Sequence, residues 1–274
     1  MKIVILTGAE LRHTFLRMTI ALDPKIKVLR SYCEGTETSL SHKFRAPISG
    51  SDLRHRHISD REASERSFFQ NFVETSGDKS APVFLPKGDI NLPENVDEIS
   101  ALAPDLVVAY GCSLIREPLI SSFPKRFLNV HLGLSPYYRG SGTNFWPLVE
   151  GRPECVGATF MYLDAGIDTG EIIHQVRATM YPEDTPHQIG NRLIQDISQI
   201  YPKVIRAANQ LMQMPPLPLP DDVRICRQKD YSENSVEALY RRFDDGMIKK
   251  YLANQSERWT STPILENPAI TAFD

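Results

Sequence analysis

Two polar side chains stand two positions apart at the end of an apolar run. Because successive side chains of a strand alternate between its faces, the carboxamide of Asn129 and the imidazole of His131 should point to the same side. Gly133 and Pro136 follow, so the chain leaves the strand for a shaped loop. An imidazole exchanges a proton near neutral pH, and a carboxamide donates a hydrogen bond to developing negative charge. Asp168, in the downstream quartet IDTG, is the candidate third member of this group.

Each of these residues also has a plain structural interpretation. Asn129 alone is typical of a turn, His131 of a hydrogen-bonded histidine at a strand end, and Asp168 of a turn residue that bonds its own backbone. The combination of the spacing with the flanking letters YYRG and IDTG favours catalysis.

The composition is that of an ordinary globular protein. The chain has 274 residues, of which 41% are hydrophobic and 24% charged, and its formal net charge is -3. The chain therefore lacks the overall positive charge that is typical of a nucleic-acid-binding protein. Four cysteines without CxxC spacing argue against a zinc site and a disulfide framework, so we expect no metal and a reducing, cytoplasmic location. We also expect no signal peptide and no membrane span.

Three weaker features leave alternatives open. The basic run from Arg54 to His57 is more typical of a solvated face than of a phosphate site, and His55, His57 and Asp60 could in principle share a metal. The remaining histidines read as structural or surface residues; they are His13, His42, His174 and His187. PPLPLP at 215–220 is interpreted as a rigid spacer rather than a ligand for a partner.

Periodicity predicts a doubly wound, mostly parallel sheet that opens as strand, glycine and helix. We expect strands at 3–6, 26–29, 83–84, 106–110, 156–163 and 171–176, and one that carries Asn129 and His131. We expect helices at 11–22, 59–73 with Ser59 as its cap, 97–102, 114–123, 143–150, 185–211, 235–243 and 246–252. The capping box of Thr185 and Gln188 marks the clearest helix start. These elements divide the chain into a main domain at 1–214, a linker at 215–220 and a C-terminal extension at 221–274, which could pack on the core or form a homodimer.

The stretch NVHLGLSPYYRG, followed by a helix, a strand and DAGIDTGEII, resembles the folate-dependent formyltransferases. That family includes glycinamide ribonucleotide, methionyl-tRNA and amino-sugar formyltransferases. The resemblance covers roughly residues 2–211, and strongly 104–175. It implies a Rossmann-like formyltransferase core with a short C-terminal helical extension. Relatives usually have a serine and a second leucine where this chain has Gly133 and Ser135.

The resemblance also implies roles. Asn129, His131 and Asp168 match the family's catalytic residues, which handle an oxyanion intermediate and the proton of the incoming amine; Asp168 would raise the pKa of His131 or relay a proton. The formyl donor would be 10-formyltetrahydrofolate. Its pterin would lie between two segments after strands, consisting of Cys112, Ser113, Leu114 and Ile115, and of Asp164, Ala165, Gly166 and Ile167.

The ends of the chain bear on the acceptor amine. The tRNA enzymes of this family carry a basic C-terminal domain of about a hundred residues, so we expect tRNA to be an unlikely partner, and a lone Gly8 weakens the purine-pathway alternative. The layout is closest to the sugar-nucleotide N-formyltransferases. Arg12, His13 and Lys87 are candidate partners for a diphosphate. Methionyl-tRNA or another small amine remains an alternative acceptor, and hydrolysis of formyltetrahydrofolate an alternative reaction.

Overall fold

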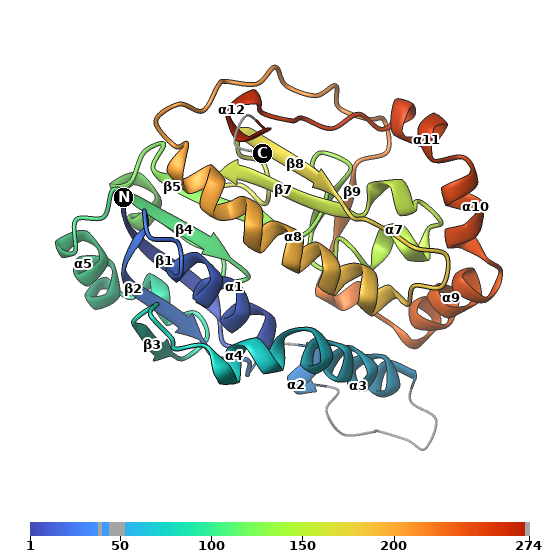
Figure 1. Cartoon of the computed structure of the whole chain (residues 1–274), viewed down its shortest axis with the longest axis horizontal. Helices are drawn as coiled ribbons and strands as arrows, with labels where there is room; N and C mark the ends of the chain where they lie inside the picture. The colour runs from blue at the N-terminus through green and yellow to red at the C-terminus, as the bar shows by residue number, and fades with distance from the viewer. Residues whose placement is uncertain (38–39, 44–52, 272–274) are drawn as a thin grey trace.

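A seven-stranded sheet forms the centre of the molecule in a computed structural model that describes residues 1–37, 40–43 and 53–271 (Figure 1). Its strands are β1 (Lys2–Gly8), β2 (Lys27–Glu34), β3 (Pro82–Leu85), β4 (Leu106–Tyr110), β5 (Phe127–His131), β7 (Gly157–Tyr162) and β8 (Ile172–Arg177). The order is β3-β2-β1-β4-β5-β7-β8; β7 runs antiparallel to both of its neighbours, β5 and β8, and the other neighbouring strands pair in parallel. The predicted doubly wound, mostly parallel sheet is confirmed, with β4 at its centre.

Helices cover both faces of this sheet because its central strands are apolar on both sides. In β1, Ile3 and Ile5 pack toward α1 (Leu11–Ala21) and α8 (Pro186–Arg206), while Val4 and Leu6 pack toward α5 (Pro93–Ala101) and α6 (Leu119–Ser122). The alternation follows from the two-residue period of a strand. Helix α8 begins at the predicted capping box and continues through Pro202.

Several helix boundaries differ from those predicted. The helix expected at 59–73 begins earlier, as α3 (Leu53–Glu65), and continues through a π-helical turn, η1 (Arg66–Gln70), into α4 (Asn71–Thr75), so Ser59 is not a cap. Of the predicted helix at 114–123 only α6 forms, and of 143–150 only α7 (Trp146–Val149). Helix α5 starts four residues before the predicted 97, because Pro93 fits its first turn.

The C-terminal extension begins with a short strand. β9 (Arg224–Cys226) pairs in parallel with β6 (Tyr138–Gly140), which follows the loop after His131, to form a separate two-stranded sheet. The predicted helices follow as α9 (Glu233–Asp244) and α10 (Met247–Ala253), and α11 (Gln255–Ser261) and α12 (Pro268–Thr271) were not predicted. The short elements are α2 (Leu40–Lys43) and the 3₁₀ turns η2 (Asp89–Asn91), η3 (Pro153–Cys155) and η4 (Gln228–Asp230).

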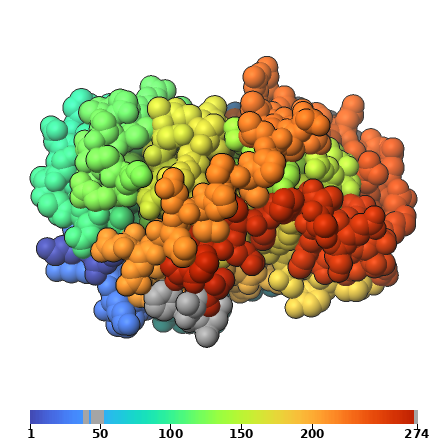
Figure 2. All heavy atoms as spheres, turned by 90° about the horizontal axis from the view of Figure 1, so that it is seen from above, coloured from blue at the N-terminus to red at the C-terminus, as the bar shows by residue number. Residues whose placement is uncertain are grey.

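The last part of the chain returns to the sheet and covers its edge strand. The backbone N–H of Gln175 in β8 donates to the carbonyl of Leu265 at 2.7 Å, and the N–H of Leu265 donates to the side-chain oxygen of Gln175 at 3.0 Å. Asn267 donates its N–H to Nδ1 of His174 at 3.0 Å. Figure 2 shows this red segment lying across one face of the molecule. The pairing protects β8 from joining another chain. Among the residues described, no helix has the length and apolar character that crossing a membrane requires.

Candidate active site

A cavity of about 860 Å³ opens where the parallel strands end. Its wall includes Gly8 at the end of β1, the segment after β4, and Asn129 to Leu132 at the end of β5. Strands β2 and β3 lie on one side of β1, whereas strands β4 and β5 lie on its other side. The chain therefore winds away from β1 in opposite directions. Such switch points are where open α/β sheets bind their ligands.

The three candidate catalytic residues meet in this cavity. Nδ1 of His131 lies 3.3 Å from Oδ1 of Asp168, and Asn129 lines the same cavity two residues earlier on β5. The other oxygen of Asp168 accepts a hydrogen bond from the N–H of Gly140 at 2.8 Å. Asp168 lies on the loop between β7 and β8, as predicted, and its φ of 50° is one that residues other than glycine rarely adopt. The sequence therefore identified three side chains that the fold brings together.

Burial decides the protonation of His131. Loss of solvent lowers its pKa, and the carboxylate of Asp168 and the backbone of Tyr138 act in the opposite direction without restoring the ordinary value. The imidazole is therefore neutral near pH 7. If Nδ1–H faces Asp168, the lone pair is on Nε2, which has no hydrogen-bond partner among the described protein groups.

Gly133, one of the two positions at which this chain differs from the residues usual in the family, has a steric reason for being glycine. A Cβ atom at this position would lie 2.5 Å from Nε2 of His131 and 2.6 Å from Cβ of Thr143. Thr143 occupies this space and donates its hydroxyl to the carbonyl of Leu132. Glycine is therefore the residue that lets the imidazole and Thr143 sit as they do.

Both predicted pterin segments contribute to the wall of the cavity. All of their residues line it except Ala165. Leu114 and Ile167 are apolar yet 56% and 55% exposed, so a flat heterocycle between them would bury apolar surface. Burial raises the pKa of the Cys112 thiol to about 12, so this residue forms a neutral part of the wall.

A buried carboxylate holds the first of these segments. Glu34, at the end of β2, is fully buried and accepts hydrogen bonds from the N–H of Ser113 at 2.5 Å and of Gly88 at 2.9 Å. Lys87 lies 3.4 Å from the same carboxylate. Because two amides and a cation share this buried charge, Glu34 fixes the backbone at Ser113. Sequence reasoning did not identify this residue.

The second segment is held by its own side chains. Asp164 accepts hydrogen bonds from the hydroxyl of Thr169, 2.9 Å from each carboxylate oxygen, and from the N–H of Gly166 at 3.0 Å. A Cβ at Gly166 would overlap the Thr169 hydroxyl. The loop that carries Asp168 is therefore closed by local hydrogen bonds.

On the side of β1, the wall carries charges that neutralise one another. Arg12 pairs with Glu10 and with Glu65, the latter at 2.8 Å, and Arg61 lies 3.5 Å from Glu65 and 3.9 Å from Glu10. Arg12 and Lys87, two of the predicted diphosphate partners, are thus each paired with a carboxylate. The third, His13, is buried, and desolvation lowers its pKa well below the ordinary value.

Aromatic rings gather around His57 on the remaining side. Its ring lies 4.5 Å from that of His187, 5.6 Å from that of Phe145 and 6.4 Å from that of Tyr231, and Nδ1 is 3.2 Å from the Tyr240 hydroxyl. Desolvation lowers the pKa of His57 to about 4 and that of His187 to about 3, so both are neutral. No group of three potential metal ligands occurs in the part of the chain that the structure describes.

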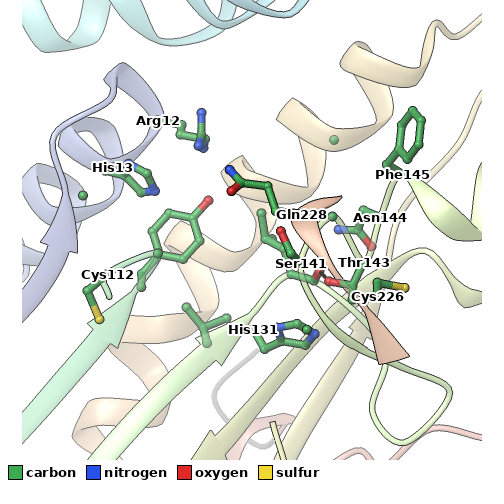
Figure 3. A pocket seen from close by; sticks show the side chains of 18 of the residues that line it. Arg12, His13, Cys112, His131, Ser141, Thr143, Asn144, Phe145, Cys226 and Gln228 are labelled. Carbon is green, nitrogen blue, oxygen red and sulfur yellow. Dashed lines mark hydrogen bonds between the residues drawn. The ribbon is translucent and has the colours of Figure 1, made fainter. Parts of the chain in front are cut away.

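Sequence reasoning missed most of this second half of the cavity. Figure 3 shows Arg12 and His13 on one side, Phe145 and Cys226 on the other, and His131 below. The C-terminal extension contributes Cys226, Arg227, Gln228 and Tyr231 to the wall. These residues follow the proline-rich stretch, where no periodic pattern of the sequence indicates a contact with β6.

A mostly parallel sheet with helices on both faces makes this an α/β protein, and the buried His–Asp pair lies at the switch point, in a candidate site at the carboxyl edge of the sheet. The chain belongs to the formyl transferase family, whose model matches residues 58–205. The predicted family is confirmed. The match contains β5, the loop after it and the whole of the segment that carries Asp168.

Curated relatives match the central part of the chain. Methionyl-tRNA formyltransferase of Geobacter sulfurreducens is 36% identical over 115 residues, and that of Desulforamulus reducens 38% over 117 residues. Each alignment covers 42% of this chain and 36% of the relative. The chain thus matches little more than a third of the length of these relatives.

Solved structures share the fold over a longer stretch. Phosphoribosylglycinamide formyltransferase from Anaplasma phagocytophilum has a TM-score of 0.54 and 15% identity, covering 77% of this chain and 87% of its own. A sugar N-formyltransferase from Shewanella sp FDAARGOS_354 has a TM-score of 0.53 and 17% identity, covering 84% and 78%. These likenesses support the Rossmann-like core.

Proposed function

We propose that this protein transfers a formyl group from 10-formyltetrahydrofolate to a small-molecule amine. The observation that carries the proposal is the His131–Asp168 pair, whose Nδ1 and Oδ1 atoms lie 3.3 Å apart. Asn129 lines the same cavity. One side is apolar at Leu114 and Ile167 and suits a pterin. Family membership supports the same chemistry.

In the proposed mechanism the amine nitrogen attacks the formyl carbon, which becomes tetrahedral and places negative charge on the formyl oxygen. The carboxamide of Asn129 donates a hydrogen bond to that oxyanion. Neutral His131 accepts the proton that the amine loses, and Asp168 stabilises the imidazolium that results. The bond to N10 of the folate then breaks, and the proton passes from His131 to the departing nitrogen. The products are a formamide and tetrahydrofolate.

We further propose that the acceptor is the amine of a nucleotide-linked amino sugar. The cavity is large enough for more than the donor's pterin, and the rings of Phe145 and Tyr231, 5.4 Å apart, offer apolar faces for a base. Arg227, which is exposed and lines the cavity, is the cation we assign to the diphosphate, since Arg12 and Lys87 are already paired.

Methionyl-tRNA is the second candidate acceptor, and the relatives at 36% and 38% identity favour it. A single experiment separates the candidates. The protein is incubated with 10-formyltetrahydrofolate and, in separate reactions, with 3-amino and 4-amino deoxysugar nucleotides, glycinamide ribonucleotide, charged initiator tRNA, or water alone. Formylated product, remaining donor and released tetrahydrofolate are then measured by mass spectrometry in each reaction.

A formylated sugar nucleotide is the expected result. Formylation of charged tRNA alone would overturn the proposed acceptor, and release of tetrahydrofolate at the same rate in every reaction would make the protein a hydrolase. The absence of donor consumption in all of them would contradict the formyl-transfer proposal itself.

A further inference from the structure

The carboxylate of Asp168 depends on a backbone amide from another part of the chain. Its Oδ1 faces His131, and its Oδ2 accepts the Gly140 N–H at 2.8 Å. The left-handed φ of Asp168 is an unfavourable conformation for a residue with a side chain. The hydrogen bond from Gly140 therefore fixes the direction in which this carboxylate meets the imidazole.

Gly140 in turn is held by the C-terminal extension. It ends β6, and it is aligned with Cys226 of β9. On one side of it the N–H of Ser141 donates to the carbonyl of Cys226 at 2.9 Å. At the other end of the pairing, the N–H of Arg224 donates to the carbonyl of Tyr137 at 2.9 Å.

This small sheet is anchored on both strands. A two-stranded sheet is marginal by itself. Here the buried side chains of Tyr138 and Cys226 share an apolar cluster with Leu134 and Trp146. Glu150 adds a polar link, since it accepts the Tyr138 hydroxyl at 2.7 Å and lies 3.1 Å from Arg224. The position of β6 is therefore tied to that of β9.

The close approach of the two strands requires glycine at position 140. Its φ is 94°, and a Cβ atom there would lie 2.3 Å from the carbonyl oxygen of Cys226. A side chain at 140 would have to push β9 and β6 apart. The contact is thus a specific fit between the end of β6 and β9, which lies outside residues 58–205, the part that matches the family model.

We propose that β9 is a positioning element of the catalytic centre: through β6 it holds the Gly140 amide in place, and this amide orients Asp168 toward His131. The proposal rests on the proposed function for its kinetic consequences, because it assigns Asp168 a role in turnover. It also has a consequence that needs no activity. If β9 is displaced, the carboxylate moves away from the imidazole and the pKa of His131 falls further.

The first test compares two glycine-to-alanine variants. Gly140→Ala places a side chain at a left-handed φ and brings its Cβ into collision with Cys226. Gly246→Ala also places a side chain at a left-handed φ, of 73°, but its Cβ would have no atom within 4 Å. We expect Gly140→Ala to lower kcat by about tenfold to a hundredfold, with an unchanged Kd for tetrahydrofolate. Gly246→Ala should keep the wild-type kcat. Equal kcat values for the two variants would overturn the proposal.

A double-mutant cycle tests whether the effect passes through Asp168. If Gly140 acts by orienting this carboxylate, Gly140→Ala should cost little further kcat in an Asp168→Asn background. Additive losses would show that the glycine acts by another route and would refute the proposal.

A second pair of variants removes a hydrogen bond between the strands without changing β6. Arg224→Pro lacks the N–H that binds the Tyr137 carbonyl, and Arg224→Ala keeps it while losing the same side chain. We expect the proline variant to lose at least about tenfold more kcat than the alanine variant. Similar values in two folded variants would argue against a role for the pairing.

The imidazole itself supplies the readout that is independent of turnover. NMR titration of His131 in labelled protein should give a lower pKa in Gly140→Ala than in the wild type and in Gly246→Ala. An unchanged pKa would overturn the positioning role even in an active enzyme. Conversely, if the wild type formylates no acceptor but Gly140→Ala lowers the pKa of His131, the proposed function is refuted and the positioning role stands.

Discussion

Replacing Asp168 by asparagine tests the electrostatic part of the mechanism. The carboxylate oxygen lies 3.3 Å from Nδ1 of His131 and is one of the causes that raise the pKa of this histidine against the effect of burial. Asparagine has nearly the same shape, can accept the Gly140 N–H, and tolerates the left-handed backbone at this position. The variant therefore removes a charge while leaving the loop in place.

The direction of the change follows from the charge and the distance. An opposite charge this close favours the protonated imidazole, so the pKa of His131 should fall further below its ordinary value in Asp168→Asn. Because the neutral imidazole is the proposed base, the acidic limb of kcat/KM should move to lower pH. The rate at the optimum should fall at least about a hundredfold, since the imidazolium loses its counter-charge.

Two measurements check this prediction. NMR titration gives the pKa of His131 in both proteins, and the pH profile of formyl transfer gives the limb. Tetrahydrofolate binding, followed by tryptophan fluorescence, shows that the variant is folded. A pKa of His131 that stays the same or rises, or an acidic limb that does not move, would remove Asp168 from the proton path.

Three further predictions concern other parts of the site. Gly133→Ser should displace the His131 ring, because its Cβ would lie 2.5 Å from Nε2, and kcat should fall at least about tenfold; a wild-type kcat would refute the steric argument. Glu34→Gln should raise the Kd for tetrahydrofolate by about tenfold, since the Ser113 amide loses a charged acceptor, and an unchanged Kd in fluorescence titration would contradict this. His57 has a pKa of about 4 in the folded protein, so between pH 6.5 and pH 4 the unfolded chain takes up a proton that the folded chain does not, and the free energy of unfolding falls. Urea unfolding should show that this fall is smaller by up to about 3 kcal/mol in His57→Phe. A fall of the same size in the variant and the wild type would exclude His57 as its source.

The sequence was most informative where one segment carries both structure and chemistry. The apolar run before Asn129 predicts β5, and the two-residue spacing places His131 on the same face, so the core of the site could be found without coordinates. The capping box at Thr185 likewise marks the start of α8 correctly, because its two hydrogen bonds are local.

Elements that depend on distant partners could not be found in this way. Helix α3 begins at Leu53, six residues before the predicted start, where the Leu53 N–H donates to Glu233 of α9 at 3.2 Å and His57 contacts Tyr240. These partners lie about 180 residues away, so no local pattern records them. The pairing of β6 with β9 is hidden for the same reason, since each strand has only three residues.

Helix lengths were overestimated where loops serve the cavity. Residues 114–118 were expected to be helical, yet Ser113 is bound to Glu34 and the Asn91 side chain bonds the backbone of Leu114 and Arg116. These side-chain contacts hold the segment in an irregular form, and the helix begins only at Leu119. Apolar residues at helical spacing do not reveal such contacts.

In the proposed mechanism His131 carries the proton during formyl transfer, in a cavity that binds the folate. The most direct test is to compare wild-type protein with His131→Ala, measuring both tetrahydrofolate binding by fluorescence and formyl transfer from 10-formyltetrahydrofolate to the best acceptor of the panel. We predict that the variant binds tetrahydrofolate with the wild-type Kd and transfers no measurable formyl group. A variant that binds equally well and keeps the wild-type kcat would show that His131 takes no part in the reaction.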